Sequence, residues 1–439
     1  MTYTVSEVLQ FIQENDVKFI RLAFCDILGK QKNISIMPNE LPRAFTNGIS
    51  FDASAIQGFM NIEESDLFLF PDPSTLSILP WRPSHGRVVR FFCDIKHPDG
   101  TPFEGNGRDF LKNAIKAAEE KGYVCKFGAE CEFYLFKTDE DGNPTYIPYD
   151  NGSYCDIAPL DKCENIRREI CLNIEEMGMQ PESSHHEQGP GQNEIDFKYS
   201  DALTSADNLV TFKSAVKTIA ASNGLYASFM PKPIENKSGN GLHINVSLYK
   251  NSSNIFRSNT ASHNQEAESF IAGILMHVKE MTSFLNPLTN SYKRFGAFEA
   301  PKYISWSHQN RSQLIRIPAD SGELSRMELR SSDPACNPYW TFGLIIYAGL
   351  YGIENNLKLP EPCDFNLYNA DKDDIKHIDT LPENLFEALE ITKQSDFITS
   401  LIPPKTLEKY ISIKYNEYLA YTNADDKNKV EKELYFDQI

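Results

Sequence analysis

Alternating apolar and polar residues mark four short segments of the chain. They are residues 128–136 (GAECEFYLF), 193–199 (NEIDFKY), 241–248 (GLHINVSL) and 326–330 (RMELR). Successive side chains of a β-strand point to opposite faces, so this alternation predicts strands with one buried face and one polar face. We therefore expect four half-buried strands, each presenting a row of polar side chains.

Helical patterns lie between and around these strands. They predict helices over 5–14, 108–121, 162–177, 205–222, 264–285 and 338–355, and further helices in the last fifty residues. The helix over 162–177 is preceded by Asp161 and contains Glu164, a capping-box pattern, and Gly178 follows its end. The polar stretch 361–383 is predicted to be a long loop.

The first hundred residues differ from the rest in having closely spaced β-like runs separated by turn residues. These runs cover 19–24, 67–70, 77–79 and 88–93. A chain of 439 residues is also large for one hydrophobic core. We predict an α+β protein with a small N-terminal domain over 1–105 and a larger catalytic domain over 106–439.

Composition narrows the classes of function. The formal charge is −18 and the pI is about 5.0, which excludes a nucleic-acid binder that needs a basic face. The most apolar stretch, 338–353, is shorter than a bilayer span, so no membrane association is expected. Nine cysteines without a CxxC pair, and no signal-peptide pattern at the N-terminus, indicate a reducing compartment. We expect a soluble, cytoplasmic protein.

The polar faces of the four strands carry an unusual concentration of acids. Together with the turn before residue 193 they present Glu130, Glu132, Glu187, Glu194, His243 and Glu328. A solvated surface explains any single strand. If the strands share one sheet, however, the carboxylates repel one another unless cations lie between them. Carboxylate oxygens suit Mg²⁺ or Mn²⁺, and two-metal sites of this kind support phosphoryl transfer.

An interruption of the predicted strand can bring two of these acids to the same side. Glu187 and Glu194 are seven residues apart, which would place them on opposite faces of one straight strand. Gly189, Pro190 and Gly191 interrupt that strand, and a reversal there lets both carboxylates meet one ion. The alternative is a hairpin with incidental acids.

Arginines gather in the last third of an otherwise acidic chain, at positions 294, 311, 316, 326 and 330. Arginine captures carboxylate and phosphate groups and stabilises charge in phosphoryl transfer, although salt bridges to nearby acids are an equal alternative. The chain has neither a Walker A motif nor a GxGxxG turn, so any ATP site is neither a P-loop nor a Rossmann turn.

Seven ordered blocks of the chain resemble glutamine synthetases of the bacterial type I class. The blocks are FDASAI (51–56) with ESDLFLFPD (64–72), GAECEF (128–133), HHEQGPGQNEID (185–196), KPIENKSGNGLHINVS (232–247), NSYKRFGAFEAP (290–301), NRSQLIRIP (310–318) and RMELRSSDPACNPY (326–339). The resemblance implies a small β-grasp-like N-terminal domain and a catalytic domain built on a curved antiparallel sheet. It also implies a homo-oligomer, a dodecamer of two stacked six-membered rings with active sites between subunits.

The resemblance also implies roles for individual residues. Two or more Mg²⁺ or Mn²⁺ ions would be held, one by Glu132, Glu187 and Glu194 and another by Glu130, His243 and Glu328. Glutamate would contact Gly239, Arg294, Glu299, Arg311 and Arg330. ATP would contact Glu182, Ser247, Arg311 and Arg316. The catalytic residues would be Asp52, serving the neighbouring subunit's site, Arg311 and Glu299, which lies on a closing flap.

The implied reaction is the ATP-dependent ligation of ammonium to L-glutamate through γ-glutamyl phosphate, a step of nitrogen assimilation that gives glutamine, ADP and phosphate. Two alternatives remain open: a relative that joins glutamate to another amine, and a non-catalytic ring-forming relative. Asp52 favours ammonium, because a small cation benefits from a close carboxylate, and the complete ligand set favours catalysis.

Several positions depart from the family pattern. Ala53 and Ala55 stand where relatives have Gly and Ser, Ser238 replaces an Asn, and Asn245 replaces a His near ATP. The flap sequence RFGAFE is one residue shorter than the common version. Tyr368, in NLYN, resembles a tyrosine that some relatives nucleotidylate, and we interpret it as an ordinary loop tyrosine. No departure removes an implied metal ligand.

Overall fold

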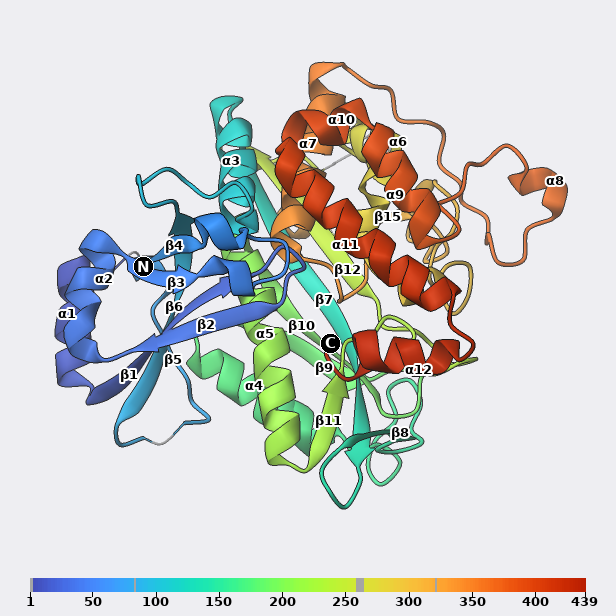
Figure 1. Ribbon diagram of the computed structural model, residues 1–439. Coiled ribbons are helices and arrows are strands. Elements are labelled where there is room, and N and C mark those ends of the chain that lie inside the picture. The colour runs from blue at the N-terminus through green and yellow to red at the C-terminus, as the bar shows by residue number, and fades with distance from the viewer. Residues whose placement is uncertain (1–2, 83, 258–263, 320–321) are drawn as a thin grey trace.

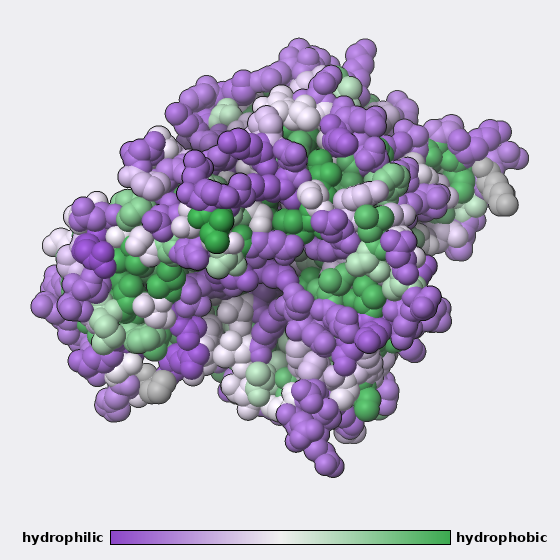
Figure 2. Space-filling view, in the orientation of Figure 1, coloured by the Kyte–Doolittle hydropathy of each residue, from purple (hydrophilic) through white to green (hydrophobic). Residues whose placement is uncertain are grey.

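A computed structural model of the protein describes residues 3–82, 84–257, 264–319 and 322–439 (Figure 1). The N-terminal part, blue in the figure, lies beside a larger part built around a long sheet. The face seen in Figure 2 is largely hydrophilic, with scattered apolar patches. Among the described helices, none has the length and apolar character needed to cross a membrane.

The N-terminal part contains a six-stranded sheet in the order β2-β1-β6-β4-β3, with β5 added to β6. β1 and β6 run parallel, and the other neighbours are antiparallel. Two helices accompany the sheet. The buried apolar residues of these helices and of the sheet form a hydrophobic cluster separate from that of the larger part. The bounds are α1 (Val5–Glu14), β1 (Val17–Cys25), β2 (Gln31–Ile36), α2 (Leu41–Asn47), β3 (Ile49–Asp52), β4 (Asp66–Pro71), β5 (Ser77–Ile78) and β6 (Arg87–Lys96).

The larger part is built on a ten-stranded sheet in the order β14-β15-β16-β12-β7-β10-β9. Its pairs are antiparallel except β14 with β15, and β8, β11 and β13 add at its margins. The bounds are β7 (Tyr123–Thr138), β8 (Pro144–Pro148), β9 (Pro181–His186), β10 (Gln192–Asp201), β11 (Leu225–Ser228), β12 (Leu242–Lys250), β13 (Ser253–Asn254), β14 (Trp306–His308), β15 (Ile315–Ile317) and β16 (Met327–Leu329).

The four strands predicted from alternation are neighbours in this sheet, in the order β16-β12-β7-β10. The prediction that one face of each is buried is confirmed. Ala129, Cys131 and Phe133 of β7 lie in the main hydrophobic cluster with Ile244 of β12 and Leu329 of β16. Because these residues alternate with the acids, the acids of all four strands lie on the opposite face.

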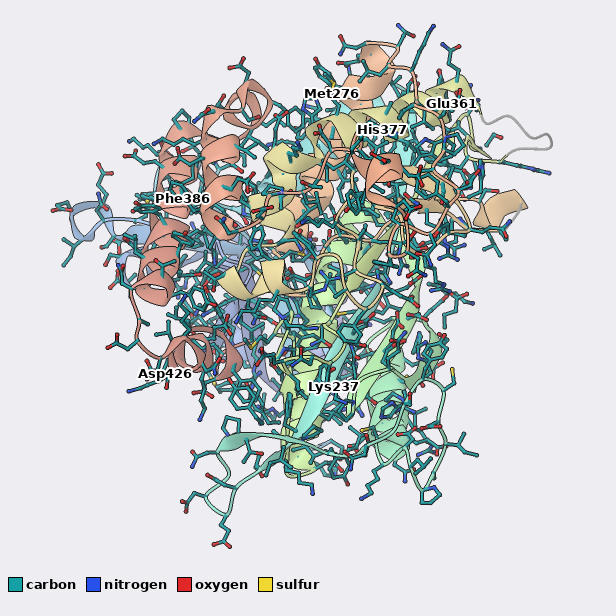
Figure 3. All side chains as sticks on the ribbon, turned by 90° about the vertical axis from the view of Figure 1, so that its right-hand side faces the viewer. Lys237, Met276, Glu361, His377, Phe386 and Asp426 are labelled. Atoms are coloured by element: carbon teal, nitrogen blue, oxygen red, sulfur yellow. The ribbon has the colours of Figure 1, made fainter. Side chains whose placement is uncertain are left out.

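Helices cover the apolar face of the sheet and extend beyond it. Close packing of α6 against α7 relies on glycine, because a Cβ atom on Gly273 would lie 2.1 Å from the carbonyl oxygen of Ala348. On the outer side, Met276 of α6 and Phe386 of α9 are exposed (Figure 3). The bounds are α3 (Gly107–Glu120), α4 (Glu164–Glu176), α5 (Ala202–Ser222), α6 (Gln265–Leu285), α7 (Pro338–Glu354), α8 (Lys372–Ile375), α9 (Leu385–Gln394), α10 (Asp396–Leu401), α11 (Pro404–Thr422) and α12 (Lys427–Glu431).

The predicted capping box at the start of α4 is wrong. The helix begins at Glu164 with Cys163 as N-cap, and no side chain caps it. The carboxylate of Asp161 accepts hydrogen bonds from Arg167 and from the backbone N–H of Cys163 instead. A buried arginine thus takes the oxygens that a capping residue would offer to the first turn of the helix.

Candidate active site

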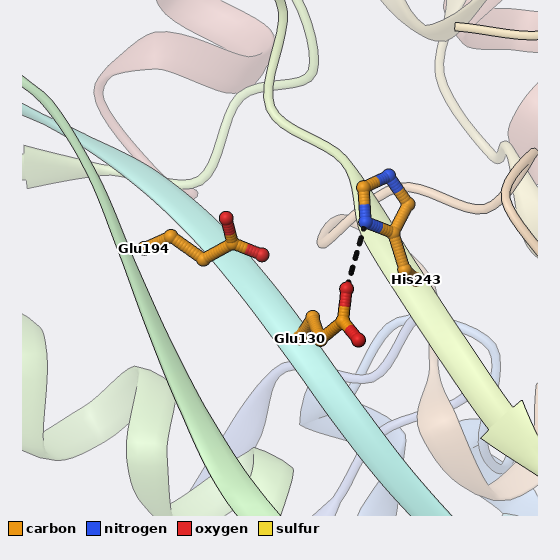
Figure 4. A group of neighbouring side chains, drawn as sticks. All are labelled: Glu130, Glu194 and His243. Carbon is orange, nitrogen blue, oxygen red and sulfur yellow. Dashed lines mark hydrogen bonds and ion pairs between the residues drawn. The ribbon is translucent and has the colours of Figure 1, made fainter. Parts of the chain in front are cut away.

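The acidic face is centred on β7, between β10 and β12. Glu194 lies directly opposite Glu132 on the neighbouring strand, and Asp196 lies opposite Glu130. On the other side of β7, His243 is the cross-strand partner of Glu130. Figure 4 shows Glu130, Glu194 and His243 converging from three strands. Their ligand atoms lie within 4.8 Å of one another, close enough to share one ion.

Glu130 is held as a carboxylate by its neighbours. Its Oε2 lies 3.2 Å from Nδ1 of His243, and its Oε1 accepts a hydrogen bond of 2.8 Å from the amide of Asn245. Burial opposes ionisation of Glu130, but the hydrogen bonds of both partners and the positive charges of His243 and Arg330 lower its pKa to about 2. Arg326 donates in turn to the amide oxygen of Asn245 at 2.8 Å.

Glu132 and Glu194 experience the opposite effect. Burial is the largest cause that raises the pKa of both carboxyl groups, and neighbouring acids add to it, although His243 opposes the rise at Glu132. Burial and Glu130 likewise raise the pKa of Asp196 to about 6. Like charges directly opposite one another destabilise a sheet, and divalent cations among them would remove the repulsion. The donor set therefore fits hard cations that prefer oxygen ligands.

A buried clamp shapes the turn that carries Glu187. His186 is fully buried, its Nε2 lies 2.9 Å from Oδ1 of Asp150, and its Nδ1 lies 2.6 Å from the backbone oxygen of Glu187. The same carboxylate oxygen accepts a hydrogen bond of 2.8 Å from the N–H of Gly191. Asp150 therefore fastens both sides of the β9–β10 reversal, and the predicted break at residues 189–191 is confirmed.

His185 connects the two acids of that reversal. Its Nδ1 lies 3.5 Å from Glu187, and its Nε2 lies 3.4 Å from Glu194. These three residues form a second group whose ligand atoms lie within 4.8 Å of one another. Glu194 thus belongs to two adjoining groups of ligand atoms, one with Glu130 and His243 and one with His185 and Glu187.

Arginines flank the β16 side of the acidic face. Glu328 is fully buried and forms ion pairs with both Arg316 and Arg330, while Nδ1 of His243 lies 3.9 Å away. Nη2 of Arg330 lies 3.9 Å from the carboxylate of Glu299. Arg294 is buried and donates to the backbone oxygens of residues 331 and 332 at 3.1 and 3.2 Å. Its Nε has no hydrogen-bond partner among the described residues, so part of a buried cation is left for a ligand.

The loop before β12 needs glycine because it lies against the arginine. A Cβ atom on Gly239 would lie 2.5 Å from the carbonyl oxygen of Pro231 and 2.6 Å from Cγ of Arg294. The N–H of Gly241 donates to Glu132 at 2.8 Å. This hydrogen bond fixes the loop before β12 to the carboxylate of Glu132.

Other residues implied by the resemblance lie farther from the acidic centre. Asp52 is exposed at the end of the edge strand β3, where its carboxylate accepts a hydrogen bond from the N–H of Ser54 and caps the short turn Ala53–Ala55. Glu182 is exposed on the edge strand β9, and Arg311 is exposed. Ser247 is buried and donates to the backbone oxygen of Ser325 at 3.1 Å.

The segment around Glu299, which was predicted to form a flap, and one loop tyrosine lie near the arginines. Phe298 and Glu299 both adopt positive φ (49° and 64°), and the ring of Phe298 stacks under Nζ of Lys232 at 4.5 Å. Positive φ is uncommon for bulky residues, so the flap stores backbone strain. Tyr368, interpreted from the sequence as an ordinary loop residue, is near Arg330. Burial raises its pKa to about 12, although the positive charge of Arg330 opposes the rise.

Sequence reasoning left several members of the site out. His185 and Asp196 stand within the alternating HHE and EID patterns, which could have identified them. Gln192, whose amide donates to Glu132 at 3.0 Å, gave no comparable signal, because a glutamine at a strand end is usually a surface residue.

Comparison with known proteins agrees with this architecture. A family model for the β-grasp domain of glutamine synthetase matches residues 16–98, and one for the catalytic domain matches residues 104–433. The glutamine synthetase of Methanosarcina mazei is 48% identical over 423 residues, covering 95% of both chains. Among solved structures, a GmaS protein in complex with ADP has a TM-score of 0.87 at 30% identity and full coverage of both chains.

A second solved structure is the Plasmodium falciparum glutamine synthetase, with a TM-score of 0.86 at 26% identity over 99% of each chain. The fold prediction, a β-grasp domain joined to a catalytic domain on a curled sheet, is thereby confirmed. With both domains matched and nearly half of all positions identical to a glutamine synthetase along almost the whole chain, this enzyme belongs to the glutamine synthetase family.

Proposed function

We propose that the enzyme joins ammonium to the γ-carboxylate of L-glutamate at the expense of ATP, through γ-glutamyl phosphate, in nitrogen assimilation. The observation that carries the proposal is the acidic face, where Glu130, Glu132 and Glu194 lie on adjoining strands next to Arg316 and Arg330. The similar GmaS protein binds ADP, which supports ATP as the co-substrate.

Two or more Mg²⁺ or Mn²⁺ ions fit this face. We assign one to Glu132, Glu187 and Glu194 and another to Glu130, His243 and Glu328, with His185 and Asp196 close at hand. Bound there, the ions would neutralise phosphate oxygens during phosphoryl transfer. The raised pKa values of Glu132 and Glu194 support the assignment, because a cation bound beside them would stabilise the ionised form of both groups.

Arginine and glycine residues would bind and orient the substrates. Arg294, beside the Gly239 loop, and Arg330, beside Glu299, would receive the carboxylates of glutamate. Arg311 and Arg316, with Glu182 and Ser247, would contact ATP and offset the charge that spreads over the transferred phosphate. The γ-carboxylate of glutamate then attacks the terminal phosphate, and ADP leaves.

Ammonium would be received from a neighbouring subunit. Asp52 is exposed on an edge strand, so we assign it to the neighbour's site, where its carboxylate attracts ammonium and accepts a proton before ammonia attacks. The Glu299 flap would keep water from the acyl phosphate. This arrangement requires an oligomer, and we propose a dodecamer of two stacked hexameric rings in the cytoplasm.

Product analysis tests the proposal. The purified enzyme is given ATP, glutamate and Mg²⁺ with ammonium, methylamine, ethylamine or putrescine, and phosphate and the amide product are both quantified. We expect equal amounts of phosphate and glutamine, with ammonium the best substrate. A larger amine as the best substrate would replace the proposed function with γ-glutamyl-amine ligation. If the oligomer is folded but releases no phosphate with any of the amines, the protein is a non-catalytic relative.

A further inference from the structure

A cavity lies outside the acidic face, where the N-terminal domain meets the larger domain. It has a volume of about 650 Å³. One wall is the turn between β1 and β2, another is α5, and a third is the C-terminal end of the chain. A hydrophilic hollow is visible in this region, between the N-terminal domain and the C-terminal segment (Figure 2). No residue assigned to catalysis or substrate binding above lines this cavity.

The lining of this cavity is strongly basic in a chain whose formal charge is −18. Among its described lining residues, Glu417 alone bears an acidic side chain, and it forms an ion pair with Lys414 at 3.0 Å. The cationic lining residues are Arg21, Lys30, Lys32, Arg90, Lys213, Lys217 and Lys414. Seven of the 43 lysine and arginine residues of this acidic chain therefore line one cavity.

The central cations of the cavity lack acidic partners. In the described parts of the chain, no carboxylate lies within 4.0 Å of the ammonium group of Lys30, Lys213 or Lys217. Lys213 donates to the backbone oxygens of Pro334 and Cys336 at 3.0 and 3.3 Å, and Lys217 donates to that of Gln438 at 3.1 Å. Neutral carbonyl groups orient these lysines without neutralising them.

Arg90 adds a buried cation to the same cavity. Arg90 is only 7% exposed, and its guanidinium group donates a hydrogen bond of 2.9 Å to the hydroxyl oxygen of Thr211. Within the described parts of the chain, its Nε atom has no hydrogen-bond partner. Buried polar groups are nearly always satisfied, so an unsatisfied Nε of a residue that lines the cavity indicates a missing acceptor.

The lysines also repel one another. Lys213 and Lys217 are one turn apart on α5, a spacing at which like charges destabilise a helix. Burial, and then the charges of Lys213 and Lys30, lower the pKa of Lys217 to about 8. This arrangement costs stability, and a negative charge held between the ammonium groups would restore it.

We propose that this cavity is a binding site for a small multivalent anion, one that carries phosphate groups or several carboxylate groups. Lysine ammonium groups that line one cavity suit such anions, and the guanidinium group of Arg90 would supply a further hydrogen-bond donor. Trp81 and Leu79 also line the cavity and offer apolar surface, so the ligand can be an organic anion larger than phosphate itself. The site is separate from the acidic face and does not depend on the proposed reaction.

Isothermal titration of the intact oligomer tests the proposal. Pyrophosphate and citrate are titrated at constant ionic strength in the presence of EDTA, with chloride as the monovalent reference. We expect saturable binding of at least one multivalent anion and none of chloride. The anion that binds distinguishes a phosphate ligand from a polycarboxylate ligand. Absence of saturable binding by both overturns the proposal.

Matched variants locate the site. Lys217→Met and Lys30→Met remove one cation from the cavity each, Lys116→Met removes an exposed cation from α3, and Arg316→Met removes one beside the acidic face. We expect the cavity variants to weaken binding about tenfold or more, and the other two to leave it unchanged. Lys30 lies on a turn, so its variant remains informative if Lys217→Met does not fold. Loss of binding in Arg316→Met with retention in Lys30→Met overturns the proposal.

Discussion

Glu194 of β10 lies directly opposite Glu132 of β7, in the middle of the sheet. Both carboxyl groups are buried, and both have raised pKa values because burial and neighbouring acids disfavour their ionised forms. Two facing carboxylates in a sheet interior weaken the fold unless cations accompany them. We therefore expect the acidic face to couple metal binding to stability.

This coupling predicts a pH-dependent effect of metal. A carboxyl group whose pKa is raised by folding stabilises the folded state at low pH, and this contribution is lost as the pH rises through the raised value. Asp196, with a pKa of about 6, and Glu194 both behave in this way. We expect added Mg²⁺ to raise the melting temperature more at about pH 8 than at about pH 5. Differential scanning calorimetry measures both shifts.

The variant Glu194→Gln is the control for this effect. It removes one of the facing charges, so the difference between the two Mg²⁺-induced shifts should shrink. Equal shifts at both pH values in the unmodified enzyme would contradict the account.

Asp150 is expected to support the metal site from below. Asp150→Asn removes the charge that pairs with His186 and weakens the hold on Gly191, so the turn bearing Glu187 should loosen. Breaking a buried pair in this way costs about 3 kcal/mol. We expect a lower melting temperature together with weaker Mn²⁺ binding.

Asp139→Asn is a matched control, because Asp139 accepts backbone hydrogen bonds in an exposed turn away from the site. Its melting temperature and Mn²⁺ affinity should be unchanged. If Asp150→Asn lowers stability but binds Mn²⁺ normally, the clamp has no role in positioning Glu187.

The absence of a side chain at Gly239 is expected to be required for glutamate binding, because Arg294 packs against this residue. In Gly239→Ala the new Cβ atom would overlap Cγ of the arginine, which must then move. We expect the KM for glutamate to rise about tenfold or more with a smaller effect on the KM for ATP. Gly128→Ala adds the same methyl group at an ordinary contact distance of 3.5 Å and should leave both values nearly unchanged. An equal rise in both KM values would show a general loss of structure.

Asn245 is expected to act on Glu130. Asn245→Leu removes the amide that donates to the carboxylate and the oxygen that accepts from Arg326. The pKa of Glu130, about 2 in this structure, should then rise, and the acidic limb of the kcat/KM profile should move to higher pH. An unchanged profile with lower kcat at every pH would assign Asn245 a different role.

The alternation of residues was sufficient to predict the central strands but not their full length. Segment 128–136 was predicted from its alternation, whereas β7 extends from Tyr123 to Thr138. β9 (PESSHH) escaped prediction because an edge strand with two polar faces shows no alternation. β14 and β15 have three residues each, too few for a periodic signal.

The side-chain partners of the site were even less accessible to sequence reasoning. Glu328 and Arg316 are twelve residues apart, and only the pairing of β15 with β16 makes them neighbours. The same holds for Asp150 and His186, which meet across 36 residues. Spacing identifies the side of a strand on which a residue lies, whereas contacts between strands depend on the order of strands in the sheet.

The central claim is that the acidic face binds divalent ions through Glu132, Glu194 and their neighbours. Electron paramagnetic resonance of Mn²⁺ titrated into the metal-free enzyme and into Glu194→Gln counts the bound ions directly. The account predicts two or more tightly bound ions per subunit in the enzyme, and the loss of at least one in the variant. An enzyme that binds no Mn²⁺ tightly, or a variant that binds as many ions as the enzyme, would contradict it.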